Sequence, residues 1–173
     1  KYSEHANGMA LALKIANEDQ GRSIVEKLLA DDPNLFIKRA TGMTIVTPAL
    51  SYFLHKGIAQ YGHVDASFDL LRRRFDHMLA PQYNGTLWEE WWLDGTGRSG
   101  KLDNRITRSD AQTESAFMPA LFAEFLLGVQ PSIPGMREVI IKVPQTKIKK
   151  IASVVPSPLG ILNVNWNRAN SNC

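Results

Sequence analysis

The chain has 173 residues, of which 44% are hydrophobic and 21% are charged, and its formal net charge is +3. This composition excludes an intrinsically disordered chain and is sufficient for a domain-sized hydrophobic core. The longest apolar run, from Ala116 to Leu127, is interrupted by Pro119 and Glu124. It is shorter than the roughly 18 residues expected of a transmembrane helix, so no membrane span is predicted.

The basic residues are scattered, except for two runs at Arg72–Arg74 and Lys147–Lys150. Neither run forms a stripe or alternates with aromatic residues. We therefore interpret them as solvated faces of a helix and a strand, and we exclude nucleic acid as a partner. Cys173 is the single cysteine, so no disulfide framework and no cysteine-based metal site is predicted. No cofactor is expected.

The chain opens with two segments whose apolar residues recur at helical spacing. Ser3 is a suitable N-cap for a first helix that ends near residues 17–21. A second helix is predicted from Arg22 to Ala30, where the following Asp31-Asp32-Pro33 stops it. The first turn of the first helix carries three polar residues that we interpret as exposed capping side chains, with recruitment to a site as the alternative: Glu4, His5 and Asn7.

A helical hairpin is predicted next, with Thr47-Pro48 opening its first helix and Tyr61-Gly62-His63 forming the turn. Three histidines of this region have no metal-binding spacing, so we interpret them as surface residues: His55, His63 and His77. No metal site is predicted.

The second half of the chain changes from helical to strand periodicity. Ser109 and Gln112 predict a capping box that opens a helix to Leu127, which is apolar nearly all round and therefore expected to be buried on most sides. Gly128 and Pro131 should end it. Short β-rich runs bounded by prolines then follow at 139–143, 148–155 and 160–166. Three strands are too few for a closed sandwich, so partner strands are expected from elsewhere in a longer chain.

Between these halves lies the stretch from Asn84 to Arg98, which reads NGTLWEEWWLDGTGR. Three tryptophans and three carboxylates fall within seven residues: Trp88, Trp91, Trp92, Glu89, Glu90 and Asp94. Aromatic faces stack on the apolar face of a sugar ring, while carboxylates accept its hydroxyl protons or activate water. The stretch therefore predicts a carbohydrate site. The alternative is structural, with tryptophans packed beneath a long connection and solvated acids.

In this order of elements the chain resembles the bacterial α-L-rhamnosidases of the six-hairpin glycosidase group. The T-(I/L)-W-E-x-W segment of that family is matched by Thr86-Leu87-Trp88-Glu89-Glu90-Trp91, and its L-G-(V/I)-x-P-x-x-P-G segment by Leu127–Pro131 with Pro134-Gly135. The resemblance implies a mainly α fold. Residues 1–130 would be the C-terminal portion of an (α/α)6 barrel, and residues 131–173 would belong to a C-terminal β-sandwich. A periplasmic or extracellular location is also implied.

The resemblance further implies inverting hydrolysis of terminal α-L-rhamnosides, with Glu89 as general base. Residue types alone leave Glu89 and Glu90 as equal candidates, and only the motif separates them. The general acid would precede Lys1, so the chain is expected to be a fragment that is inactive alone and has the rest of a longer chain as its partner. The implied substrate-binding residues are Trp88, Trp91, Glu90, Asp94 and Gln112.

At Gln112 the family has a histidine, so a sugar contact made by imidazole is altered or lost in this chain. Two alternatives stay open. One is another six-hairpin glycosidase with a different sugar preference, since the shape of the pocket and not the barrel determines the sugar. The other is a non-catalytic carbohydrate-binding relative that keeps the aromatic residues and lacks the general acid.

Overall fold

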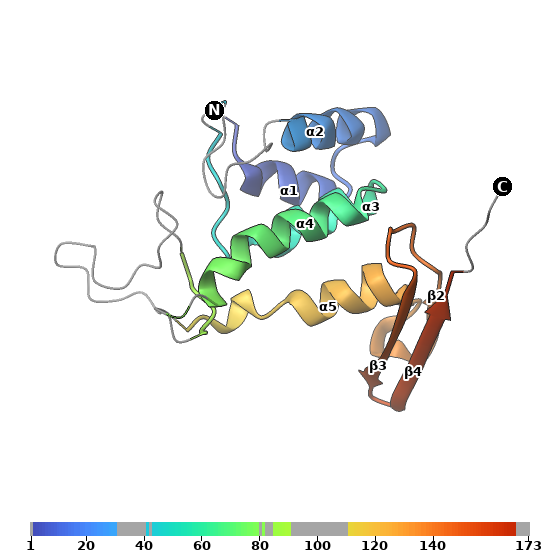
Figure 1. Ribbon diagram of the computed structural model, residues 1–173. Coiled ribbons are helices and arrows are strands. Elements are labelled where there is room, and N and C mark those ends of the chain that lie inside the picture. Colours follow the sequence, from blue (N-terminus) through green and yellow to red (C-terminus); the bar gives the residue numbers. More distant parts are fainter. Residues whose placement is uncertain are drawn as a thin grey trace. The chain divides into compact units, whose positions relative to one another are not determined.

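The computed structural model describes residues 2–30, 41, 43–79, 81, 85–90 and 111–168 (Figure 1). These residues are mainly helical, with two antiparallel sheets of two strands each, as the sequence predicted at this level. The helices are α1 Glu4–Ala12, α2 Glu18–Ala30, α3 Ser51–Gln60, α4 Val64–Phe75 and α5 Met118–Phe122. The strands are β1 Val129–Pro131, β2 Val139–Ile141, β3 Lys150–Ser157 and β4 Gly160–Asn167.

The chain forms two compact units, Lys1–Phe117 and Met118–Cys173. Each unit has its own cluster of buried hydrophobic residues. The units divide after Phe117, whereas the domain boundary implied by the family resemblance lies after residue 130. That boundary stays a prediction. No helix in the described ranges has the length and hydrophobicity needed to cross a membrane.

Helices α1 and α2 follow the predicted periodicity, and α2 ends at Ala30 as predicted, but the boundary between the two helices differs. Ser3 is the N-cap of α1, as predicted, and its hydroxyl accepts a hydrogen bond from the Ala6 N–H. The predicted end of the first helix near residues 17–21 was wrong, since α1 ends at Ala12. Helix α2 begins at Glu18 and not at Arg22, because Asn17 and Gln20 form a capping box before it. The Asn17 side chain accepts from the Gln20 N–H at 2.9 Å, and the Gln20 side chain accepts from the Asn17 N–H at 3.1 Å.

The predicted hairpin of α3 and α4 is confirmed, with its turn at Tyr61-Gly62-His63. Gly62 has a φ of 87°, a left-handed conformation that glycine adopts without strain. Helix α3 begins at Ser51 and not at Thr47, because Pro48 starts a separate turn whose carbonyl accepts the Ser51 hydroxyl.

Helices α1 and α3 approach closely, and glycine makes this approach possible. A Cβ atom at Gly8 would lie 2.8 Å from the Leu54 Cα, and one at Gly57 would lie 2.6 Å from the Leu11 Cβ. Residues from α1, α2, α3, α4 and the segment before α3 then form the core of this unit: Leu11, Val25, Leu28, Val46, Leu54, Ile58 and Leu70. Packing of these side chains between the four helices and the segment before α3 fixes their arrangement.

The interior of this unit also holds three side chains that the sequence analysis placed on the surface. Glu4, His55 and Arg74 are all buried. The interpretation of Glu4 as an exposed capping residue, of Arg74 as part of a solvated run and of His55 as a surface residue was therefore wrong. His63 is exposed, as predicted. Glu4 and Arg74 can be buried because charged side chains are tolerated in the interior where they are paired and hydrogen-bonded.

The long helix predicted to Leu127 is broken. Within residues 111–127 the chain forms a 3-10 turn at Thr113–Ser115, then α5, then a π-helical segment at Ala123–Leu127. Pro119 explains the break, because proline cannot supply the N–H that would pair with the carbonyl of Ser115 one turn earlier. Burial is also less complete than predicted, since 41% of Phe122 is exposed.

Gly128 ends the helical segment in a left-handed conformation with a φ of 75°, as predicted. Strand β1 then pairs antiparallel with β2, and β3 pairs antiparallel with β4. The three predicted β-rich runs are thus confirmed as strands. Their packed residues, together with the end of the helical segment, make the second core: Leu127, Val129, Val155, Val164 and Trp166.

Candidate functional site

The described part of the tryptophan stretch, residues 85–90, is held by its main chain at three consecutive points. The Gln112 N–H donates to the Leu87 carbonyl at 2.6 Å. The Ser115 hydroxyl donates to the Trp88 carbonyl at 2.7 Å, and the Trp88 N–H donates to the Met78 sulfur at 3.5 Å. The stretch is therefore fixed between the 3-10 helix Asp76–Leu79, which follows α4, and the 3-10 turn at 113–115.

Trp88 is buried, with 2% of its surface exposed. The resemblance implies a sugar-stacking role for its ring, and stacking needs an accessible face. In this structure its burial favours the structural alternative, in which the ring packs beneath the connection. The stacking role of Trp88 stays a prediction.

Glu89 and Glu90 follow directly, and both are half-buried. Each retains partial access to solvent while its neighbour Trp88 is anchored in the interior. This arrangement suits a carboxylate that must be both positioned and reachable by substrate. Their equal burial does not distinguish the two glutamates.

Gln112 is brought to the same place by the main-chain bond to Leu87, and its side chain is half-buried. The structure therefore brings together four of the sequence-predicted site residues, which are Trp88, Glu89, Glu90 and Gln112. Trp91 and Asp94 lie outside the described residues, as do Trp92 and Ser109.

The interior of the first unit holds a buried ion pair that the sequence did not predict. The Arg74 guanidinium donates to both carboxylate oxygens of Glu4, at 2.7 and 2.8 Å. The same carboxylate accepts the Val46 N–H at 3.0 Å. This bidentate geometry, with an additional main-chain donor, is what a buried pair requires to offset desolvation.

His55 completes the buried cluster. Its Nδ1 lies 3.2 Å from the Ser67 carbonyl oxygen, and the Ser67 hydroxyl donates to the His55 carbonyl at 2.8 Å. A carbonyl accepts only, so Nδ1 carries the proton in this contact. Nε2 is buried and has no hydrogen-bond partner within the described part of the chain. Burial, and then the charge of Arg74, lower the pKa of His55 from 6.5 to about 3, so the ring is neutral at pH 7.

An aromatic contact connects this cluster with the 3-10 turn. The Phe117 ring stacks on His55, with centroids 6.2 Å apart, and meets Phe75 edge-on at 5.8 Å and Tyr52 edge-on at 5.9 Å. Phe117 follows Ser115 by two residues. The segment that holds Trp88 is thus itself held against α3 and α4.

Helical spacing could have found part of this arrangement. Glu4 precedes Gly8 and Leu11 by four and seven residues, which places it on the buried face of α1. Arg74 likewise follows Leu70 by four residues on the buried face of α4. Met78 follows Phe75 by three residues and continues the apolar stripe that runs through α4, which predicts its burial. For Ser115 the sequence carries no comparable pattern, because its contact with Trp88 joins residues 27 positions apart.

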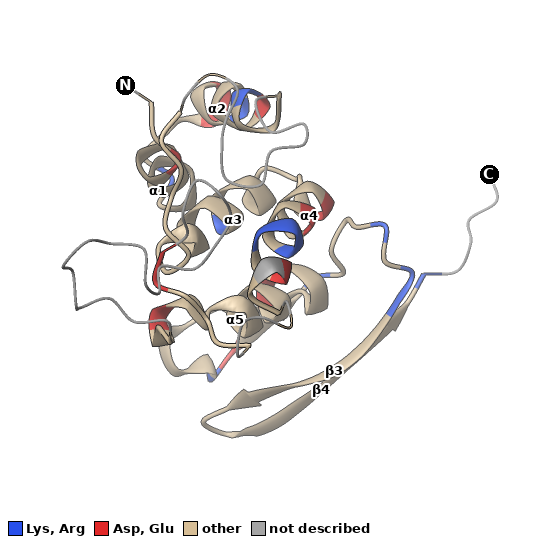
Figure 2. Ribbon diagram, turned by 60° about the vertical axis from the view of Figure 1, so that its left-hand side comes forward, with Lys and Arg blue, Asp and Glu red and all other residues tan. Residues whose placement is uncertain are grey.

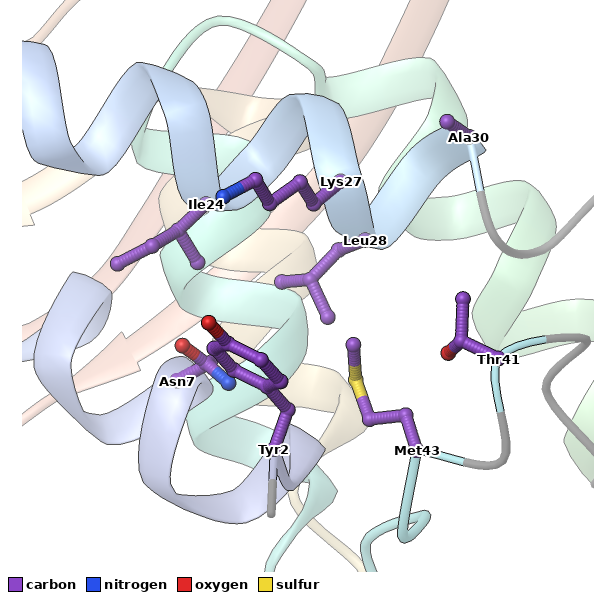
Figure 3. Close-up of a pocket in the computed structure, with 8 residues that line it drawn as sticks. All are labelled: Tyr2, Asn7, Ile24, Lys27, Leu28, Ala30, Thr41 and Met43. Atoms are coloured by element: carbon purple, nitrogen blue, oxygen red, sulfur yellow. The ribbon is translucent and has the colours of Figure 1, made fainter.

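Two cavities of the first unit lie away from the tryptophan stretch. The first, of about 470 Å³, is mainly apolar and lies between α1, α2 and the segment around Met43 (Figure 3). In Figure 3 the Leu28 and Met43 side chains face one another across it, and Tyr2 and Asn7 lie together on another side. The second, of about 760 Å³, is mainly polar. Among the described residues assigned to the carbohydrate site, none lines either cavity, whereas Asn7, for which recruitment to a site was the alternative, lines the first.

Comparison with protein-family models gives no match, and comparison with curated protein sequences gives none either. Among the described residues there is no group of three His, Cys, Asp or Glu side chains arranged to hold a metal ion.

Proposed function

We propose that this chain is the C-terminal part of a six-hairpin glycosidase that hydrolyses terminal α-L-rhamnosides with inversion. In this proposal residues 1–130 belong to an (α/α)6 catalytic barrel and residues 131–173 to the β-sandwich that follows it. The observation that carries the proposal is the segment Thr86–Trp91, which matches the family motif at its tryptophan and glutamate positions.

Glu89 is the proposed general base. In an inverting mechanism the base removes a proton from water on one face of the sugar, while a carboxylic acid protonates the leaving oxygen on the other. The two carboxyl groups then stand roughly 6.5–9.5 Å apart, which leaves room for the water. By the resemblance, the acid comes from an earlier hairpin of the same barrel.

The main-chain bonds around Glu89 support this role. A general base must be held within a fraction of an ångström of its productive position, which requires a fixed backbone. The residues on its N-terminal side are fastened through the Leu87 carbonyl and through both main-chain polar groups of Trp88. A solvated surface loop would need no such set of contacts.

The strands support the proposed sandwich. The β3–β4 hairpin carries a single charged residue, Lys150, and is otherwise drawn in tan in Figure 2. Its Val154 and Ile161 are 55% and 68% exposed. A two-stranded hairpin with apolar residues on its open face is stabilised when further strands or another layer cover it.

The test is made in a longer protein that contains this chain. Glu89→Gln should lower hydrolysis of an aryl α-L-rhamnoside by several orders of magnitude without altering the unfolding transition, because the carboxamide cannot accept the proton from water. Glu90→Gln is the comparison variant. Because Glu90 is a proposed substrate-binding residue, this variant should raise KM, but it should retain far more activity than Glu89→Gln. Near-normal turnover by Glu89→Gln, or a larger loss in the Glu90 variant, would contradict the assignment of the base.

The same assay separates hydrolysis from binding alone. Stoichiometric binding of L-rhamnose by a longer protein that shows no hydrolysis would contradict the enzymatic proposal and favour a carbohydrate-binding relative. A different sugar preference would appear as turnover of another aryl glycoside in place of the rhamnoside.

A further inference from the structure

The polar cavity of the first unit is formed where three segments meet. Its volume is about 760 Å³, within the range of small-molecule sites. The connection between α1 and α2 contributes Lys14, Ala16 and Asn17, helix α2 contributes Glu18, Arg22 and Glu26, and the end of α3 with its turn contributes Gln60, Tyr61 and His63.

This cavity is separate from the tryptophan stretch. It lies at the turn that begins α4, whereas the tryptophan stretch is reached from the other end of that helix (Figure 1). The 12 residues of α4 alone span about 18 Å at 1.5 Å per residue. A ligand in this cavity would therefore not be in contact with Glu89.

Two features of the lining indicate a ligand rich in hydrogen-bonding groups. First, the Oε1 atom of Gln60 is buried and has no hydrogen-bond partner within the described residues. Such a group is destabilising until a donor reaches it. Rotation of the terminal amide can present either its oxygen or its nitrogen to the cavity.

Second, Tyr61 offers an aromatic ring whose position is fixed by packing. A Cβ atom at Gly21 would overlap the Tyr61 ring, so the ring packs directly on the α2 backbone. The ring is half-buried and keeps part of its surface accessible. A preorganised aromatic ring beside polar groups is suited to the C–H face of a sugar or another polyol.

The charges of the lining are balanced, with Lys14 and Arg22 opposed by Glu18 and Glu26. Arg22 and Glu18 are 3.6 Å apart and compensate one another. An anionic ligand would meet two carboxylates, and a cationic ligand would meet two basic groups. A neutral molecule with hydroxyl groups can donate to the acids and accept from the bases without a charge conflict.

We infer that this cavity is a second binding site, which takes a neutral polyhydroxylated ligand of mono- or disaccharide size. The chemical class follows from the lining and does not depend on the proposed hydrolysis. Gln60 supplies hydrogen bonds, Tyr61 supplies the apolar surface, and Glu26 and Arg22 on α2 select against charged ligands.

The test uses the full chain labelled with ¹⁵N and titrated with three sugars of one shape: D-glucose, D-glucuronate and D-glucosamine, with maltose as the larger neutral probe. Saturable shifts of the amide signals of Arg22, Glu26 and residues 60–63 are expected with glucose or maltose. Binding of both charged sugars should be at least fivefold weaker. Tighter binding of either charged sugar, no saturable shift, or shifts confined to the tryptophan stretch would overturn the inference.

The matched variants are Glu26→Ala and Lys27→Ala, at neighbouring exposed positions of α2. Only Glu26 lines the polar cavity. Glu26→Ala should weaken neutral-sugar binding at least fivefold, whereas Lys27→Ala should leave it unchanged, and both should keep the wild-type unfolding midpoint. Equal effects of the two variants would overturn the assignment. Glu89→Gln should not alter binding at this cavity, so failure of the proposed hydrolysis and failure of this site are distinguishable.

Discussion

Arg74 and Glu4 form a buried ion pair in the interior of the first unit. Their ion pair joins α1 to α4, and the Val46 N–H joins the segment before α3 to the same carboxylate. Both side chains are buried, at 1% and 0% exposed. Removing one partner would leave the other charge in a low-dielectric environment without compensation.

We therefore expect Arg74→Met to lower the free energy of unfolding by about 3–5 kcal/mol, measured by urea denaturation at pH 7. Arg72→Met is the control, because Arg72 is exposed and its ion pair with Asp69, at 3.5 Å, is also exposed to solvent. That variant should change stability by less than about 0.5 kcal/mol. The double variant Glu4→Gln/Arg74→Met should be less destabilised than the sum of the single changes. Equal effects at Arg72 and Arg74 would contradict the role of the pair.

His55 predicts a specific dependence of stability on pH. Its pKa is about 3 in the folded protein, lowered by burial and then by Arg74, against 6.5 as the ordinary value. Below pH 6.5 the unfolded chain therefore binds a proton at this residue that the folded chain does not. Stability from His55 is present above pH 6.5 and is lost as the pH falls toward 3, with a slope that approaches about 1.4 kcal/mol per pH unit.

The measurement is the free energy of unfolding at several pH values between about 6.5 and 4, for the wild type and for His55→Gln. The variant should show a shallower decline with acid, because the proton uptake of His55 is removed. His63→Gln is the control, since His63 is exposed. Parallel curves for wild type and His55→Gln would show that the buried imidazole is not the titrating group.

At the scale of elements, the 3-10 turn at 113–115 acts as the support of the tryptophan stretch. The Ser115 hydroxyl satisfies the Trp88 carbonyl, and both groups belong to buried residues. We expect Ser115→Ala to cost about 1–3 kcal/mol of stability, because a buried acceptor loses its donor. Amide hydrogen exchange of residues 86–90 should accelerate. Thr113→Ala, at an exposed position of the same turn, should change neither quantity.

A single substitution at Gly128 tests the close approach of the helix end to the Lys142 carbonyl, which follows β2. Gly128 ends the helical segment with a φ of 75°, and a Cβ atom there would overlap the Lys142 carbonyl oxygen. Gly135 has a similar φ of 79° but nothing within 4 Å of an added Cβ. Gly135→Ala should therefore cost only the backbone strain, about 1–2 kcal/mol.

Gly128→Ala should cost at least about 2 kcal/mol more than Gly135→Ala, because overlap with main-chain atoms adds to the same strain. Thermal or urea unfolding of the two variants provides the comparison. Similar losses for both would mean that β1 and β2 can separate at this point without cost.

At the scale of the whole molecule, the proposed mechanism needs two carboxyl groups on opposite faces of the sugar. By the resemblance, residues 1–173 supply only the base. The 173-residue chain alone should therefore show no turnover of an aryl α-L-rhamnoside, while a longer protein containing it is active. Turnover by the chain alone, abolished by Glu89→Gln, would contradict the placement of the acid.

Secondary structure was predictable where local chemistry decides it. Ser3 at a helix start, the Gly62 turn, Gly128 at a helix end and the alternating strands were all correct, because each depends on residues a few positions apart. The prediction of one continuous helix to Leu127 was wrong, because it gave the apolar periodicity more weight than the helix-breaking effect of Pro119. For the candidate site, the sequence predicted only which residue types are present, namely the tryptophans and carboxylates of residues 84–98, and not how they are buried or held.

By itself, the sequence determined the mainly helical character of the chain, its α3–α4 hairpin and the strands after Gly128, because these follow from short-range periodicity and capping. Only the tertiary structure decided that Glu4, His55 and Arg74 are buried together and that Trp88 is fastened to Ser115. The bond between Ser115 and Trp88 spans 27 positions, and the ion pair between Arg74 and Glu4 spans 70. Their existence depends on which faces pack together, which local sequence chemistry does not determine.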